Sequence, residues 1–225
     1  MPSVGFRILP RQPGVAQDLV SLFKEIPVAN ISDCMARMTA AGPLVRPMHD
    51  GTTMAGVAFT VKSRPGDNLM LHKALDLAAP GDVIVVECGG DTTNSMLGEL
   101  MMTYAQHRGL AGIVMNGAIR DSHELRRSSF PVFAAGVTHR GPYKNGPGEI
   151  NVPIAIDGMV VQPGDLIVGD ADGVLCIPRD SAADIYAKAK AKNDLEKKQF
   201  IEMRDGTVDR SWVDKVLIEN GYDMR

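Results

Sequence analysis

Arg120 and Asp121 form the adjacent pair of side chains in this sequence with the clearest capacity for chemistry. They follow a short apolar run at residues 113–115 and an Asn116-Gly117 turn. In α/β proteins, ligands tend to bind beyond the carboxyl end of such a strand. An arginine offers a planar fork for a carboxylate, and an aspartate offers a hard oxygen for a cation such as Mg²⁺. The pair therefore indicates a site for a small acid and a divalent metal.

A helix that starts near Gly98 is the element expected to complete this site. Its apolar and long side chains recur at helical spacing at Leu100, Met101, Tyr104, Ala105 and Arg108. Gly109 is a residue of the type that commonly ends a helix. A helix N-terminus presents unpaired N–H groups and the positive end of the helix dipole to an anion. The anion cradle, Arg120 and Asp121 together form the set that an enzyme acting on a small oxo-acid requires.

Each of these side chains also has an ordinary structural explanation. Asp121 could cap the helix that follows it, because aspartate is a favoured N-cap residue. Arg120 alone would usually form a surface salt bridge. Glu99, in a first helical turn, is favourable there because of the helix dipole.

The composition describes one domain with appendages, or at most two small domains. The 225 residues are 44% hydrophobic, which is enough to bury a substantial core. The net charge is −3 and no basic run occurs, so a nucleic-acid surface is not indicated. No apolar run approaches the roughly 20 residues that cross a bilayer, and the start of the chain lacks a signal-peptide core. Three widely spaced cysteines fit reduced thiols, and we expect a cytoplasmic protein without membrane or nucleic-acid partners.

The order of the predicted elements indicates an α/β fold. Helices are expected at residues 15–24, from Asn30-Asp33 to Met38, and at 68–79, 98–108, 122–127, 180–203 and 208–220. Strands are expected at residues 54–63, 83–86, 113–115, 131–135, 152–156, 159–161, 166–169 and 173–177. Helices and strands alternate first and hairpins follow, whereas residues 136–151 read as a loop. This predicts an N-terminal helical segment (1–45), a mixed core (46–180) and a C-terminal helical arm (181–225).

The sequence contains a spaced motif in which an acidic residue is followed, after twenty intervening residues, by an Arg-Asp pair. Here the acidic residue is Glu99 and the pair is Arg120-Asp121. The pattern resembles the RraA-like family, most closely its metal-dependent aldolases for 4-hydroxy-4-methyl-2-oxoglutarate and 4-carboxy-4-hydroxy-2-oxoadipate. The likeness covers residues 33–180. It includes PGDN at 65–68, GDVIVVECGG at 81–90 and GDLIVGDADGVLCIP at 164–178.

The resemblance implies a swivelling β/β/α fold, assembled as a homotrimer or homohexamer. It implies that Asp121 holds a divalent cation, Mg²⁺ or Mn²⁺, directly and that Arg120 contacts the oxo-acid end of the substrate. The backbone N–H groups of Gly98, Glu99, Leu100 and Met101 would cradle the substrate carboxylate. Glu99 stands where many members carry aspartate; this longer acid could still hold water on the metal.

Four further residues are candidates for substrate binding, each with an ordinary alternative. Asn68 and His72 lie one helical turn apart and could face the pocket together, although a lone histidine on a helix is more often structural. Lys144 would bind the distal carboxylate, or would simply be solvated in its loop. In the aldolases, a glutamate on the C-terminal arm reaches the active site of a neighbouring subunit. Glu196 is in the corresponding place, or lies on a solvated face of i,i+4 charge pairs.

The resemblance leaves two classes of function open. The first is a class II aldolase of aromatic-acid catabolism that releases pyruvate and decarboxylates oxaloacetate as a side activity, with a water or a nearby carboxylate as the base. The second is a non-catalytic regulator that binds a ribonuclease or another protein. The arm beyond Asp180 favours the aldolase, because the regulator lacks a comparable arm. A methyltransferase is not supported, since no glycine-rich cofactor loop of that type is present, and the preferred substituent at C4 of the substrate stays open.

Overall fold

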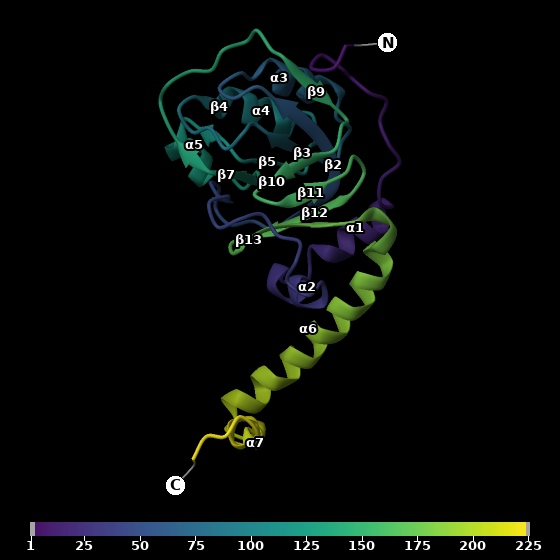
Figure 1. The fold of residues 1–225 in the computed structure, drawn as a ribbon, viewed down its shortest axis with the longest axis vertical. Coiled ribbons are helices and arrows are strands. Elements are labelled where there is room, and N and C mark those ends of the chain that lie inside the picture. Colours follow the sequence, from purple (N-terminus) through teal and green to yellow (C-terminus); the bar gives the residue numbers. More distant parts are fainter. Residues whose placement is uncertain (1–2, 224–225) are drawn as a thin grey trace. The chain divides into compact units, whose positions relative to one another are not determined.

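The computed structural model describes residues 3–223, and its internal contacts divide the chain into two compact units. The first unit runs to Ala189 and the second begins at Lys190. The first unit is a mixed α/β fold built around a nearly closed eight-stranded sheet (Figure 1). This confirms the fold class that the sequence predicted.

The large sheet combines a parallel centre with antiparallel edges. Its strands are β1 (Arg46–Pro47), β2 (Met54–Ser63), β3 (Asp82–Glu87), β5 (Gly112–Met115), β7 (Val132–Ala134), β9 (Gly148–Ile150), β12 (Leu166–Asp170) and β13 (Gly173–Ile177). Their order is β1-β7-β5-β3-β2-β12-β13, and β9 pairs with the end of β2. β1 approaches β13, where the Arg46 guanidinium donates to the Asp172 carbonyl at 2.8 Å. This contact brings the two ends of the sheet close together.

The central strands are covered on both faces, which explains their sequence. Lys62 is the only residue of β2 that is not buried. Strands that are buried on both faces lose the alternation of apolar and polar residues. The loose alternation of apolar and polar residues at 54–63 therefore predicted β2 itself, but it did not predict the strands with which β2 pairs.

Three helices cover one face of the sheet and a hairpin covers the other. The helices are α3 (Leu69–Leu77), α4 (Glu99–His107) and α5 (Ser122–Arg127). The hairpin joins β10 (Ile154–Ile156) to β11 (Met159–Val161), as its Asp157-Gly158 turn predicted. Three further helices pack on β12 and β13, namely α1 (Gln17–Phe23), α2 (Val28–Cys34) and the start of α6 (Ala182–Arg204).

A second, three-stranded sheet was missed by the sequence prediction. It pairs β4 (Ser95–Leu97), β6 (Ala118–Ile119) and β8 (Gly136–Val137) in parallel. Strands of two or three residues carry no periodicity that could reveal them. Gly98 directly follows β4 and Arg120 directly follows β6, so this small sheet sets the spacing of the candidate site.

The segment before α1 pairs with the edge of β9 through a parallel bridge between Ile8 and Ile150. Gly148 and Ile150 donate backbone hydrogen bonds to the carbonyls of Gly5 and Arg7 at 2.7 and 2.9 Å. The Arg7 side chain pairs with Glu149 at 2.6 Å. The prediction of a loop across residues 136–151 was therefore wrong at both ends, because β8 and β9 form only through partners distant in sequence.

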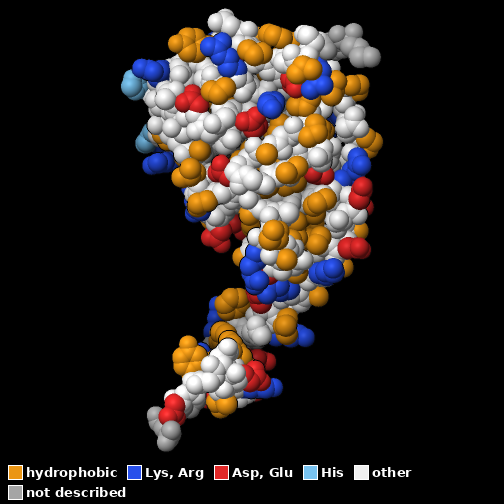
Figure 2. Space-filling model, in the orientation of Figure 1, with side chains coloured by type: hydrophobic (Ala, Val, Ile, Leu, Met, Phe, Trp, Pro, Cys, Tyr) orange, Lys and Arg blue, Asp and Glu red, His pale blue; other side chains and the backbone are white. Residues whose placement is uncertain are grey.

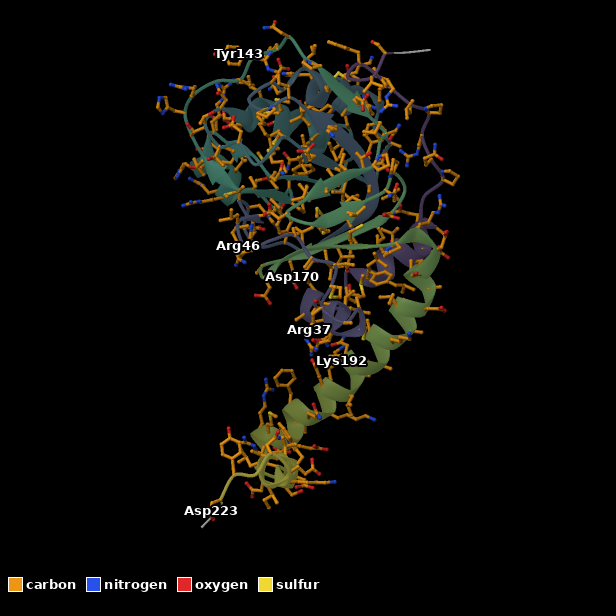
Figure 3. All side chains as sticks on the ribbon, viewed as in Figure 1. Arg37, Arg46, Tyr143, Asp170, Lys192 and Asp223 are labelled. Atoms are coloured by element: carbon orange, nitrogen blue, oxygen red, sulfur yellow. The ribbon has the colours of Figure 1, made fainter. Side chains whose placement is uncertain are left out.

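The boundaries of the second helix were also predicted wrongly. The helix begins at Val28, directly after Pro27, and not at Asn30. Its first turn is capped by the distant carboxylate of Asp170, which accepts a hydrogen bond from the Val28 N–H at 2.9 Å. The helix ends at Cys34, because Ala36 and Arg37 adopt left-handed backbone conformations. In Figure 3, Asp170 and Arg46 lie between Tyr143 at one end of the first unit and Arg37, which closely follows α2.

The second unit is helical. α6 (Ala182–Arg204) follows a 3₁₀ turn at Arg179–Ser181, and its residues from Lys190 onward belong to this unit together with α7 (Ser211–Glu219). Many of its apolar side chains are exposed, among them Leu195, Phe200, Ile201, Trp212 and Ile218. Within residues 3–223, no helix has the length and apolar character needed to span a membrane.

Charge on the first unit is mixed. Over the face shown in Figure 2, hydrophobic side chains and charged side chains of both signs are interspersed.

The cysteines are free thiols; Cys88 and Cys176 are buried and Cys34 is partly exposed. These features agree with the balanced composition and with reduced cysteines.

Candidate functional site

A cavity of about 290 Å³ lies where α3, the β4–α4 junction, the end of β6 and the loop at residues 141–144 meet. Its lining residues are Asn68, His72, Ser95, Met96, Leu97, Gly98, Leu100, Met101, Arg120, Gly141, Pro142 and Lys144. The structure therefore brings together every predicted substrate-binding residue except Glu99 and Glu196.

Gly98 is the N-cap of α4 and one of the residues that line the cavity. Any residue can adopt its φ of −143°, so the backbone conformation does not require glycine. Glycine is needed because a side chain would not fit at this position. A Cβ atom here would lie 2.5 Å from Asp121 Oδ2 and 3.0 Å from the Arg120 side chain. The N–H groups of the first turn lack acceptors inside the helix, an arrangement that suits an anion, and the Glu99 N–H among them donates to Asp121.

The apolar face of α4 differs from the expected one. Met102 and Ala105 are buried against the sheet, whereas Leu100 is 84% exposed. Leu100 and Met101 lie in the first turn and line the cavity, and the partly buried Met101 also packs against the core. The helix itself ends at His107, and Gly109 adopts the left-handed conformation that its sequence position predicted.

Asp121 precedes α5 but does not cap it. It occupies the N-cap position with a φ of 55°, and its side chain makes no capping hydrogen bond. Instead, Oδ2 accepts a hydrogen bond from the Glu99 N–H at 2.9 Å. A left-handed conformation costs a non-glycine residue about 1 kcal/mol or more, and such strain is concentrated at functional sites. The capping explanation for Asp121 is therefore not the one that the structure adopts.

Arg120 lies between two hollows. It lines the main cavity and also a neighbouring hollow of about 400 Å³ with Asp121, Ser122, Val137, Thr138 and His139. Its Nε is 3.8 Å from Asp121 Oδ2. Both side chains are nearly half exposed, so a ligand can reach either charge.

Asn68 supplies an unpaired acceptor to the cavity wall. The residue is 2% exposed, and its Nδ2 donates to the Met96 carbonyl at 3.0 Å. Its Oδ1 is buried without a hydrogen-bond partner among the described residues. A buried acceptor left without a partner costs about 1–3 kcal/mol, so it fits a position where a ligand supplies the missing donor.

His72 lies one turn further along α3 and is biased towards its neutral form. Burial lowers the pKa of His72 below its ordinary value of 6.5, and the positive charge of Lys144 lowers it further, while Asp76 acts in the opposite direction. A neutral imidazole can accept a hydrogen bond or a proton at neutral pH. His72 and Lys144 line the same cavity.

The metal ion that the resemblance implies would have the Asp121 carboxylate as its side-chain ligand in this arrangement. No cluster of three or more histidine, cysteine, aspartate or glutamate side chains suited to a metal occurs among residues 3–223. Mg²⁺ usually keeps several waters and binds through one or two carboxylates together with oxygens of the substrate. The exposed Asp121 carboxylate beside an anion cradle fits that mode of binding, whereas it would not form a closed zinc site.

Glu99 and Glu196 lie outside the cavity lining. Glu99 contributes its backbone N–H to Asp121 as described. Glu196 belongs to the second unit, where its carboxylate pairs with Lys192 at 3.1 Å, one helical turn away. The i,i+4 charge pair that the sequence offered as an alternative is thus present.

Five lining residues were missed by sequence reasoning: Ser95, Met96, Leu97, Gly141 and Pro142. The first three form β4, which had no periodic signal. The loop carrying Gly141 and Pro142 is held to that strand by tertiary contacts. The Ser95 N–H donates to the Arg140 carbonyl at 2.8 Å, and Ser95 Oγ is 3.0 Å from the same oxygen.

Comparisons with known proteins place the chain beside aldolases and RraA proteins. The family description "RraA-like: Aldolase/RraA" matches residues 28–176. A protein of Halalkalibacterium halodurans with the provisional name 4-hydroxy-4-methyl-2-oxoglutarate aldolase is 41% identical over 175 residues, covering 78% of this chain and 83% of that protein. The 4-hydroxy-4-methyl-2-oxoglutarate aldolase of one Thermus thermophilus strain is 36% identical, covering 50% of this chain and 68% of its own. The solved structure of the RNA-processing inhibitor RraA from Thermus thermophilus superposes with a TM-score of 0.64 at 30% identity, covering 69% of this chain and 94% of that one.

Proposed function

Because the chain belongs to the RraA-like family, we propose that it is a divalent-metal-dependent aldolase that releases pyruvate from 4-hydroxy-2-oxo acids. The observation that carries this proposal is the placement of three groups around Arg120. The N-terminus of α4 at Gly98 and the Arg120 side chain line the cavity, whereas Asp121 lines the neighbouring hollow that Arg120 shares. The Asp121 carboxylate does not cap α5 and instead accepts a hydrogen bond from the Glu99 N–H at the start of α4. Substrates of this class are 4-hydroxy-4-methyl-2-oxoglutarate and 4-carboxy-4-hydroxy-2-oxoadipate.

The carboxylate and 2-oxo group of the substrate fit the positive end of the cavity. The N–H groups of Gly98, Leu100 and Met101 hold the carboxylate, because the Glu99 N–H already donates to Asp121. Arg120 holds the oxygen of the 2-oxo group. Asp121 is the residue that would hold Mg²⁺ or Mn²⁺, which supplies further Lewis-acid stabilisation of negative charge on that oxygen. When the C3–C4 bond breaks, its electron pair becomes the enolate of pyruvate. Arg120 stabilises the negative charge that develops there.

The other end of the cavity faces the leaving half of the substrate. A water or a nearby carboxylate takes the proton of the 4-hydroxyl group, C4 becomes a carbonyl as the C3–C4 bond breaks, and the enolate takes up a proton at C3. Asn68 Oδ1 and the neutral imidazole of His72 are able to accept a hydrogen bond from that hydroxyl. Lys144 pairs with the distal carboxylate. Loss of CO₂ from oxaloacetate produces the same enolate, so oxaloacetate decarboxylation is a side activity of this site.

We further propose the setting in which this site works. The protein is cytoplasmic and assembles as a homotrimer or homohexamer, in which Glu196 of one copy completes the cavity of the next. Its reaction belongs to the breakdown of aromatic acids. Light scattering of the purified protein would give the assembly state, and loss of activity on Glu196→Gln in an intact assembly would support the role of Glu196.

The alternative is a regulator that binds a ribonuclease without catalysis. The similarity to the RNA-processing inhibitor RraA, over 69% of this chain, is the observation in its favour. A regulator does not require Asp121 to stay exposed beside the α4 N-terminus, and it does not turn over an oxo-acid. Enzyme assay therefore separates the two proposals.

The test is pyruvate release measured through lactate dehydrogenase. Both hydroxy-oxo acids and oxaloacetate are supplied with Mg²⁺, with Mn²⁺, and with excess EDTA. We expect turnover that EDTA abolishes and that added metal restores. Absence of turnover on all three compounds would refute the aldolase and favour the regulator.

A further inference from the structure

The segment just before α3 contains a fully buried carboxylate, that of Asp67, which the proposed reaction does not use. Its Oδ1 accepts a hydrogen bond from the Leu69 N–H at 3.0 Å, in the first turn of α3. Its Oδ2 accepts hydrogen bonds from the N–H groups of Asn145 and Gly146 at 2.7 and 2.9 Å. One side chain thus bonds to a helix and to a loop 78 and 79 residues further along the chain.

The backbone on either side of Asp67 makes the same connection. Tyr143 donates to the Gly66 carbonyl at 2.8 Å, and Asn68 donates to the Tyr143 carbonyl at 3.0 Å. The Asp67 carbonyl accepts a hydrogen bond from Ser63 Oγ at 2.6 Å, which fixes Asp67 to the end of β2. Tyr143 marks the position of this loop at the end of the first unit in Figure 3.

Lys144 lies between the two loop residues that this network holds. Tyr143 is bonded to residues 66 and 68, and Asn145 is bonded to the Asp67 carboxylate. Lys144 and Asn68 line the same cavity. The carboxylate therefore connects the two walls of the cavity that face the leaving half of a substrate.

The chemistry of the carboxylate explains why a neutral side chain would not serve equally well. Burial by itself would raise the pKa of Asp67, but the three N–H donors and the nearby charge of Arg64 lower it overall. The group is therefore ionised at neutral pH and accepts at both oxygens. An asparagine has the same shape but only one acceptor oxygen, so its NH₂ group would face a backbone donor.

We propose that Asp67 is a positioning residue that holds Lys144 at a fixed distance from Asn68 and His72 and thereby sets the affinity for substrates with a distal carboxylate. This inference rests on the proposed function, because it assigns Lys144 to that carboxylate. Asp67 itself touches no substrate. It acts by holding the loop that carries Lys144. Its loss should therefore raise KM for the longer substrate more than it slows the breaking of the C3–C4 bond.

The test compares Asp67→Asn with a matched control, Asp165→Asn. Asp165 is also buried, but it lies in the wall of a different cavity. Its carboxylate accepts hydrogen bonds from the backbone N–H groups of Gln162 at 2.9 Å and Arg179 at 3.0 Å. It also contacts Cys176 Sγ at 3.6 Å. Two reactions are followed for each variant. These are cleavage of 4-hydroxy-4-methyl-2-oxoglutarate and exchange of the C3 protons of pyruvate, which has no distal carboxylate.

For Asp67→Asn we expect KM for the longer substrate to rise about tenfold, with kcat and pyruvate exchange within about threefold of wild type. Asp165→Asn should lower the melting temperature and leave KM unchanged. In a Lys144→Met background, Asp67→Asn should change KM by less than about twofold, because two residues that act through one contact are not additive.

Equal effects of Asp67→Asn on both reactions, an unchanged KM, or full additivity with Lys144→Met would overturn the inference. If Asp67→Asn does not fold, Ser63→Ala replaces it, since it removes the hydrogen bond to the Asp67 carbonyl and retains the carboxylate. A rise in KM of about two- to threefold would then support the inference, and an unchanged KM would overturn it. Inactive wild-type protein would overturn the proposed function and this inference together, whereas an active wild type with a negative Asp67→Asn result overturns only the inference.

Discussion

The carboxylate of Asp121 accepts a hydrogen bond from the backbone N–H of Glu99 at 2.9 Å, across 22 residues of sequence. The two ends of the acidic-residue and Arg-Asp motif therefore meet in space. The contact at this point comes from the Glu99 backbone, and Gly98 leaves the room that the Asp121 side chain needs. The spacing in the motif reflects the passage of the chain through α4 and β5 between the ends of β4 and β6.

Replacement of Asp121 should abolish turnover without unfolding the protein. In Asp121→Asn, the asparagine side chain would retain an oxygen for the Glu99 N–H and tolerates a φ near 55°, but it removes the charge that a divalent cation needs. We expect this variant to lower metal-dependent kcat/KM by at least about a hundredfold, with a melting temperature close to that of wild type. Asp121→Ala should be equally inactive and slightly less stable, because alanine is strained in the left-handed conformation. Full turnover by either variant would refute the assignment of Asp121 as the metal ligand.

Gly98→Ala should damage the site through one methyl group. Its Cβ would lie 2.5 Å from Asp121 Oδ2 and 3.0 Å from Arg120, so both side chains have to move. A displacement of about 1 Å at the reacting groups can cost about a hundredfold in rate. We expect kcat to fall by at least about tenfold while circular dichroism shows an intact fold. Wild-type kinetics would mean that Asp121 and Arg120 do not act from the positions described.

The charge of Lys144 should be measurable at His72. Burial and then Lys144 lower the pKa of His72, so Lys144→Met should raise that pKa towards its ordinary value, and Asp76→Asn should lower it further. Proton NMR titration of the imidazole resolves both changes. Unchanged titration in Lys144→Met would show that the loop does not hold Lys144 near His72 in solution.

The lowered pKa of His72 also predicts that the folded protein becomes less stable as the pH falls. Folding lowers the pKa of His72, so the unfolded chain takes up a proton there at higher pH than the folded chain does. This contribution to stability is complete above about pH 6.5 and is lost as the pH falls through the lower folded value. Urea unfolding of wild type and His72→Gln between pH 5 and 8 should show a shallower loss of stability for the variant.

Arg11 should matter more to stability than its position near the start of the chain indicates. Its guanidinium forms a bidentate pair with Asp82, whose side chain is only 2% exposed. Arg11→Ala leaves that carboxylate with the Ala79 N–H, at 2.8 Å, as its remaining donor. We expect a loss of about 1–3 kcal/mol in urea unfolding.

The matched control is Asp180→Ala, which removes an ion pair to Arg179 from a side chain that is 88% exposed. Exposed pairs of this kind contribute about 0–1 kcal/mol, so the loss should be small. Equal losses for Arg11→Ala and Asp180→Ala would show that the N-terminal segment is not held to β3 by this pair.

The sequence alone determined the elements whose signals are local. The strands at residues 54–63 and 83–86, the α5 helix and the two hairpins follow from runs of apolar residues and from turn residues adjacent in the chain. The family also followed from sequence, because its motif is a matter of residue types and spacing. Seven of the twelve lining residues were also found from sequence, because they belong to the motif, to the predicted helix start beside it, to one turn of α3 or to the loop of Lys144.

The tertiary structure decided what depends on partners distant in sequence. The short strands β4, β6 and β8 exist only because they pair with one another. The cap of α2 comes from Asp170, 142 residues away, and the Asp67 carboxylate joins α3 to the Lys144 loop. The same holds for Asp121, which could have capped α5 and instead bonds to Glu99. Such contacts are set by the packing of the sheets, and local sequence patterns do not encode that packing.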